Sequence, residues 1–172
     1  LIIGDGSSSP LMRVGADSTN TTTGNIEVGS GGSGSMVLNS GDYYQVQQNM
    51  VVGQAAGSVG SVTVNGGTLN IGYDTNGAQS FASDINFNSG IGSFTQNGGT
   101  VNVARSVNLH DNAFSNTVTV SLFDGAFNVG QDMNYRTGMS SVTVSNAALS
   151  IGRDLLFNAG TGTFEVVGKI GR

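Results

Sequence analysis

SVTVNGGTLNIG, residues 61–72, is the stretch that decides the fold of this chain. In it, apolar residues alternate with polar ones, a Gly-Gly pair follows, and a second alternating run begins. Alternation with a period of two is typical of a strand with one buried face, and Asn-Gly-Gly is typical of a tight turn. The stretch recurs as SFTQNGGTVNVA at 93–104 and, degraded, as SVTVSNAALSIG at 141–152. A repeat of this length predicts a stack of similar units.

Similar alternating runs extend over most of the chain and group in threes, separated by corners rich in Gly, Asn and Ser. This pattern predicts an all-β fold, a parallel β-helix (β-solenoid) with three short strands per coil and about six coils. Parallel crossovers are almost always right-handed, so we expect a right-handed coil. One vertical file of inward side chains should then contain Val62, Phe94, Val118 and Val142.

The composition suits such a stack and argues against several other classes of protein. Of 172 residues, 28 are Gly and only 10% are charged. In a stack of coils, equivalent side chains lie about 4.8 Å apart, so like charges would repel each other. A low charged fraction is therefore typical of such a stack. The net charge of −5 argues against nucleic acid or an anionic membrane as partner. No apolar run approaches the roughly 20 residues of a membrane-spanning helix. With no cysteine, the chain has no disulfide framework.

We expect one solenoid segment, residues 1–172, with two loop insertions. Both insertions, 4–25 and 72–84, are expected at the corner between the second and third strands of a coil, so that one edge carries the loops. Both chain ends match second-strand positions, which leaves two hypotheses: a segment of a longer precursor, or a head-to-tail polymer of copies. The end-to-end contacts of the polymer would involve Leu1, Ile3, Phe164, Val166 and Ile170.

A row of polar residues comes directly before the third strand of each coil. Its members are Asn25, Asn49, Asp84, Ser106, Asp132 and Asp154. Stacked Asn and Ser side chains form hydrogen-bonded ladders in repeat folds, so a structural corner ladder is the first interpretation. The alternative is a calcium site at Asp132 and Asp154, which should lie one coil apart. The neighbouring Arg105 and Arg153 would instead neutralise these carboxylates.

Hydroxyl side chains recur on the outward face of the first strand of four coils. They are Ser61, Thr63, Ser93, Thr95, Thr117, Thr119, Ser141 and Thr143. Thr is favoured at outward strand positions and uncharged rows stack well, so a structural role is one interpretation. A face that packs on another chain or a glycan is a second. Because the rows resemble the Thr-x-Thr faces of ice-binding β-solenoids, ice is a third.

The sequence does not predict an enzyme or a bound cofactor. Its outward rows are Ser, Thr and Asn, whereas catalysis on a β-helix requires clustered carboxylates or carboxylates with Arg or Lys. His110 lies beside Asp111 without a nucleophile in register, which indicates a solvated corner. Asp124 falls in a two-residue expansion at 122–126, interpreted as a bulge or a widened turn.

GSVTVNGGTLNIG (60–72), GSFTQNGGTVNVA (92–104) and the corner Gly152-Arg153-Asp154 resemble the repeats of secreted bacterial β-helix proteins. These proteins include autotransporter passenger domains and filamentous-haemagglutinin-like adhesins, and the likeness covers 33–172 well and 1–32 in part. It implies an extracellular or cell-surface location and an adhesive or structural role. From the repeat, the low charge and the matching chain ends, we expect a building block of a surface fibre, sheath or adhesin stalk, with copies of itself or flanking repeats as partners. The alternatives are a glycan- or surface-binding module that uses the corner loops, or an ice-binding solenoid.

Overall fold

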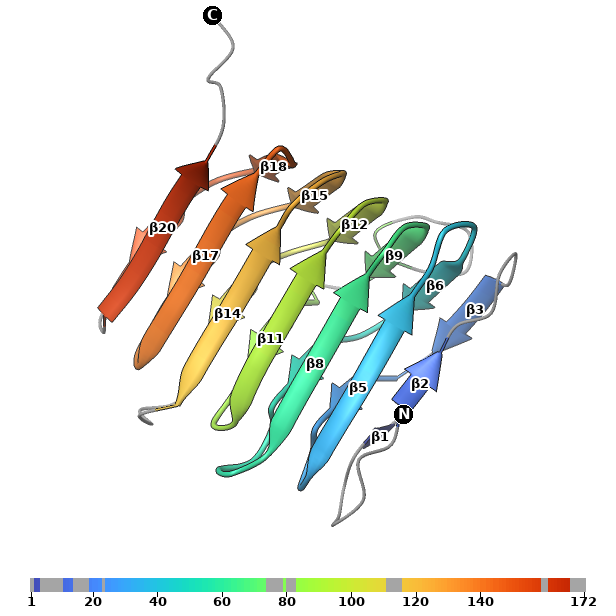
Figure 1. Cartoon of the computed structure of the whole chain (residues 1–172), viewed down its shortest axis with the longest axis horizontal. Coiled ribbons are helices and arrows are strands. Elements are labelled where there is room, and N and C mark those ends of the chain that lie inside the picture. Colours follow the sequence, from blue (N-terminus) through green and yellow to red (C-terminus); the bar gives the residue numbers. More distant parts are fainter. Residues whose placement is uncertain are drawn as a thin grey trace, which may run out of the picture.

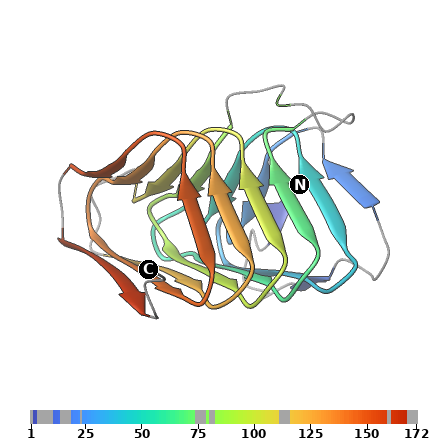
Figure 2. The ribbon, with the colours of Figure 1, turned by 90° about the horizontal axis from the view of Figure 1, so that it is seen from above.

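The fold is a three-sided parallel β-solenoid. The computed structural model describes residues 2–3, 11–13, 19–22, 24–73, 79, 83–110, 116–158 and 161–167. Its strands form three parallel sheets of seven, seven and six strands, each strand pairing with its counterpart in the next coil (Figure 1). Figure 2 shows the coils following one another along the long axis. The predicted all-β fold with three strands per coil is therefore confirmed; its hand stays a prediction.

Each sheet collects one strand from every coil. Sheet A contains β1 (Ile2–Ile3), β4 (Ile26–Val28), β7 (Met50–Val52), β10 (Ile85–Phe87), β13 (Val107–Leu109), β16 (Met133–Tyr135) and β19 (Leu155–Phe157). Sheet B, which faces the viewer in Figure 1, contains β2 (Leu11–Arg13), β5 (Ser33–Leu38), β8 (Val59–Val64), β11 (Ile91–Gln96), β14 (Thr117–Leu122), β17 (Met139–Ser145) and β20 (Thr161–Val167). Sheet C contains β3 (Thr19–Thr22), β6 (Tyr43–Val46), β9 (Thr68–Ile71), β12 (Thr100–Val103), β15 (Ala126–Val129) and β18 (Ala148–Ile151).

The core is a column of mainly aliphatic and aromatic side chains between the three sheets. Alternation puts every second residue of a strand inside, so that in β8 Val62 and Val64 are fully buried while Ser61 and Thr63 face outward. Where two aromatic rings meet, Phe94 and Phe127 pack edge to face with centroids 5.5 Å apart. This packing makes the column continuous from one coil to the next.

One element of the predicted register is wrong. Phe94 pairs with Val120, and Val118 pairs with Gly92, so the vertical file runs through Val62, Phe94, Val120 and Val142. A shift of two residues keeps each side chain on its own face, so the fold is unchanged. The same shift removes the predicted expansion at 122–126, because the corner 123–125 is as long as the corner 97–99.

The predicted phase of the N-terminus and one of the two insertions are also wrong. β1 pairs with β4 in sheet A, where the third strands lie, and not in the sheet of second strands. The stretch 4–25 contains β2 and β3, so it is the remainder of an ordinary coil. The error arose because Ile3-Gly4 matches Ile151-Gly152 of a second strand. An aliphatic residue followed by Gly also ends the third strands at Val28-Gly29 and Val52-Gly53, so the pair does not distinguish the two sheets.

The second predicted insertion lies where it was expected. It separates β9 from β10, and Tyr73 forms an isolated antiparallel bridge with Gln79 within it; residues 74–78 and 80–82 lie outside the described residues. However, 110–116 lengthens a different corner, between β13 and β14, so the extra length is not confined to one edge. Among the described residues, no helix long and apolar enough to cross a membrane is found.

Candidate functional site

The polar row before sheet A is a continuous hydrogen-bonded ladder. Each side-chain oxygen accepts a hydrogen bond from the backbone N–H of the corresponding residue one coil later. The steps are Asn25 to Asn49 (3.1 Å), Asn49 to Asp84 (2.9 Å), Asp84 to Ser106 (2.9 Å), Ser106 to Asp132 (3.4 Å) and Asp132 to Asp154 (3.3 Å). The corner ladder predicted from the sequence is confirmed, and it fixes the register of successive coils.

Two members of this ladder also hold arginines from the following coil. Arg105 donates to both carboxylate oxygens of Asp84, and Arg153 donates to both oxygens of Asp132, with Nε–Oδ1 distances of 2.7 Å. The hydrogen bonds from Arg153 hold the pKa of Asp132 below its usual value, against the opposing effect of burial. Arg153 is therefore the charged partner that the structure gives to Asp132.

The calcium hypothesis gains no geometric support from the described part of the chain. No group of three or more His, Asp or Glu side chains able to hold a metal ion occurs there. The Asp154 carboxylate lies 3.8 Å from Nε of Arg153 and is mostly exposed. Calcium at Asp132 and Asp154 stays an untested prediction.

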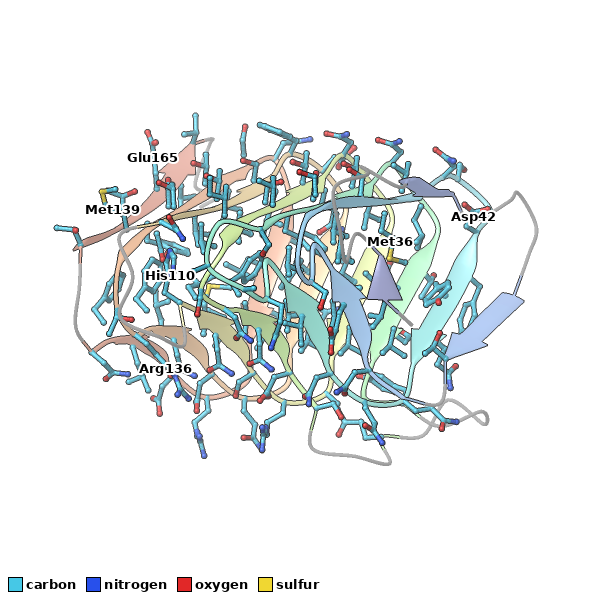
Figure 3. All side chains as sticks on the ribbon, turned by 90° about the horizontal axis from the view of Figure 1, so that it is seen from below. Met36, Asp42, His110, Arg136, Met139 and Glu165 are labelled. Atoms are coloured by element: carbon cyan, nitrogen blue, oxygen red, sulfur yellow. The ribbon has the colours of Figure 1, made fainter. Side chains whose placement is uncertain are left out.

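Sheet A carries a second ladder that the sequence analysis did not single out. Asn134 donates to Asn108 (2.9 Å) and Asn108 donates to Asn86 (2.8 Å), one amide per coil. The sequence contains the pattern that predicts this ladder, because Asn is the middle residue of three successive sheet A strands, β10, β13 and β16. Asn108 and Asn134 line a polar hollow of about 300 Å³, with Arg105, Arg136 and Arg153 among its other lining residues. Figure 3 shows Arg136 at the lower edge of the solenoid, among side chains tipped with nitrogen.

The outward hydroxyl face of sheet B differs from the prediction in one coil. Its rows are Ser61, Ser93, Thr119, Ser141 and Thr63, Thr95, Ser121, Thr143. Thr117 pairs with Met139 outside both rows, and Ser121 is the member that the sequence analysis missed. Exposed Val59, Ile91 and Met139 line one edge of this face. Packing on a chain or glycan and binding of ice stay predictions.

In the coil at the C-terminal end of the described solenoid, apolar side chains that would face the core are exposed to solvent. Phe164 and Val166, two of the predicted end-contact residues, line a hollow of about 370 Å³ together with Leu149 and Ile151. Val166 is 61% exposed, although its counterpart Val144 in the preceding coil is 5% exposed. Ile3 lies in β1 at the opposite end of sheet A; Leu1 and Ile170 lie outside the described residues.

His110 is buried, which corrects the predicted solvated corner. It is fully inaccessible, has a left-handed backbone (φ 56°), and neither ring nitrogen makes a hydrogen bond of good geometry within the described part of the chain. Burial lowers its pKa, although backbone groups of Met139, Asn88 and Asn116 oppose the shift. Asp111 lies outside the described residues, and Asp124 only caps the N–H of Gly125.

Acid should therefore destabilise the protein through His110. Its pKa is lower in the folded state, so the unfolded chain binds more protons as the pH falls below about 6.5, and stability should fall through that range. Asp132, whose pKa is also lowered, titrates only at more acidic pH. We expect the melting temperature to drop between pH 7.5 and 5.5, and to drop less in His110→Asn, which tolerates the left-handed backbone. An equal drop in both proteins would contradict this role.

The fold and these surfaces define the chain as a parallel β-solenoid repeat protein. Comparison of its sequence and structure with models of known families, with curated proteins and with solved structures finds no match.

Proposed function

We propose that the chain is an extracellular structural module, a building block of a surface fibre, sheath or adhesin stalk that extends when its open end stacks on a further coil. The observation that carries this proposal is the exposed apolar end formed by β18, β19 and β20. Among the described residues, each is the end strand of its sheet, so its outer edge presents backbone N–H and C=O groups that no described strand pairs with. The partner is a copy of the chain or a flanking repeat.

Two features favour a continuing stack over a closed end. Burying a side chain such as Val166 or Leu149 contributes about 1.5–3 kcal/mol, so covering the hollow at this end is strongly favourable. The corner ladder also reaches this end: each earlier member accepts a hydrogen bond from the next coil, and Asp154 is positioned to accept the next one. Its exposed carboxylate provides a template that sets the register of an incoming coil.

The location outside a bacterial cell rests on the resemblance of the repeats to secreted β-helix proteins. The near absence of charge on the strand faces agrees with a role in which strands stack without repulsion. No catalytic or cofactor role forms part of this proposal.

Substituting Val166 should test end-to-end assembly. Val166→Lys places a charge in the hollow at the open end, where a stacked coil would have to bury it unpaired. We expect the wild-type protein to form elongated particles at high concentration, seen by sedimentation velocity and negative-stain microscopy. Val166→Lys should weaken this association at least about tenfold.

Val59→Lys is the matched control, because Val59 is an exposed valine on the side of sheet B and not at its end. It should leave end-to-end assembly unchanged. Monodisperse short particles of the wild-type protein at high concentration, or equal effects of the two substitutions, would contradict the proposal.

A further inference from the structure

Three arginines of this acidic protein lie close together. The chain has a net charge of −5 and six basic residues, and the structure describes the side chains of three of them: Arg105, Arg136 and Arg153. All three line the polar hollow over the outward face of sheet A, which we call the groove. The remaining lining residues are amides, hydroxyls and the two paired carboxylates, with no aliphatic or aromatic side chain among them. A ligand for this groove is therefore recognised by hydrogen bonds and charge alone.

The groove offers more donors than its own acceptors engage. A guanidinium has five N–H donors; Arg105 directs two of its nitrogens at Asp84, and Arg153 directs two at Asp132, with the Asp154 carboxylate 3.8 Å from its Nε. A side-chain amide has two donors, and Asn108 and Asn134 each use one in the ladder. The carboxylates of Asp84 and Asp132 are already engaged by arginine and by backbone N–H groups. The lining carries three guanidinium groups and two carboxylates, a net charge of +1, so the complement of this surface is a ligand that is rich in acceptors and carries negative charge.

The donors are also regularly spaced. Arg105 and Arg153 precede β13 and β19, which are two strand positions apart in sheet A, so their backbones are separated by about 9.6 Å. Asn108 on β13 and Asn134 on β16 lie about 4.8 Å apart, with Asn86 one strand earlier on β10. An extended polymer lying along these strands would meet an amide on β10, β13 and β16 and a guanidinium before β13 and β19.

We propose that this groove, lined by Arg105, Asn108, Asn134 and Arg153, binds an acidic oligosaccharide, with sugar carboxylates on the guanidinium groups and sugar oxygens on the amide ladder. Guanidinium groups match carboxylates in bidentate geometry, as the pairs with Asp84 and Asp132 already show at this site. The lining has no aromatic ring on which a nucleobase would stack and no apolar pocket for a peptide side chain. Binding of such a ligand is a role beyond assembly.

Titration with a tetrasaccharide of galacturonic acid tests this inference, with its carboxyl-reduced neutral counterpart as the second ligand. We expect calorimetry to detect binding of the acidic form only. In nitrogen-15 spectra, the side-chain amide signals of Asn108 and Asn134 should shift during the titration. This second readout uses the unaltered protein and does not depend on any variant.

Substitutions separate the groove from general charge. Arg105→Gln and Arg153→Gln should each weaken binding at least about tenfold, and Arg153→Lys, which keeps the charge but loses the fork, should weaken it as well. The control Thr100→Glu changes the net charge by the same one unit on the outward face of sheet C, and should leave binding nearly unchanged. No binding by the wild-type protein, equal binding of the neutral sugar, or an equal loss in Thr100→Glu would overturn the proposal.

Discussion

Replacing Phe94 with alanine is expected to destabilise the solenoid by about 3–5 kcal/mol. Phe94 is 1% exposed and packs edge to face on Phe127, in a column enclosed by three sheets. The backbone of β11 is hydrogen-bonded to β8 on one side and to β14 on the other, so the walls cannot close over the cavity. Urea denaturation followed by circular dichroism measures the loss in the free energy of unfolding.

Phe123→Ala is the matched control for this cavity. Phe123 lies at the corner after β14, where it is 47% exposed, so its truncation should cost less than about 1 kcal/mol. Similar losses for the two substitutions would show that Phe94 does not lie in a closed core. Phe94→Leu, which restores most of the volume, should recover much of the stability.

Gly99→Ala should also cause a large loss, of at least about 2–3 kcal/mol. Gly99 has φ +76°, a conformation unfavourable for alanine, and an added Cβ would lie 2.5 Å from the carbonyl oxygen of Gly67 in the coil below. The clash is with backbone, so no side chain can move to relieve it, and the two coils would have to separate. Thermal unfolding and hydrogen exchange at Thr100 measure the effect.

Gly57→Ala separates the cost of the left-handed backbone from the cost of the clash with the neighbouring coil. Gly57 also has a positive φ (+81°), but an added Cβ there meets no atom within 4 Å. This variant should lose only the cost of the left-handed backbone, about 1–2 kcal/mol. If Gly99→Ala were no worse than Gly57→Ala, the close stacking of coils at the Asn-Gly-Gly corner would be refuted.

The sequence by itself determined which residues face the core and how many strands form a coil. Alternation in 61–72 and its repeats marked Val62 and Phe94 as buried and Ser61 as outward, and the structure agrees. The corner ladder was predictable too, because its polar members recur directly before each third strand and the stacking of coils brings such residues together.

Only the tertiary structure decided the register, the phase of the first strand and the polar groove. A period-two pattern is unchanged by a shift of two residues, so it could not choose between Val118 and Val120 as the partner of Phe94; backbone pairing and corner length decide this. His110 is fully buried, which its polar neighbours in the sequence did not indicate. The groove joins Arg105 and Asn108 of one coil with Asn134 and Arg153 of the next two, and residues of different coils become neighbours only when the coils stack.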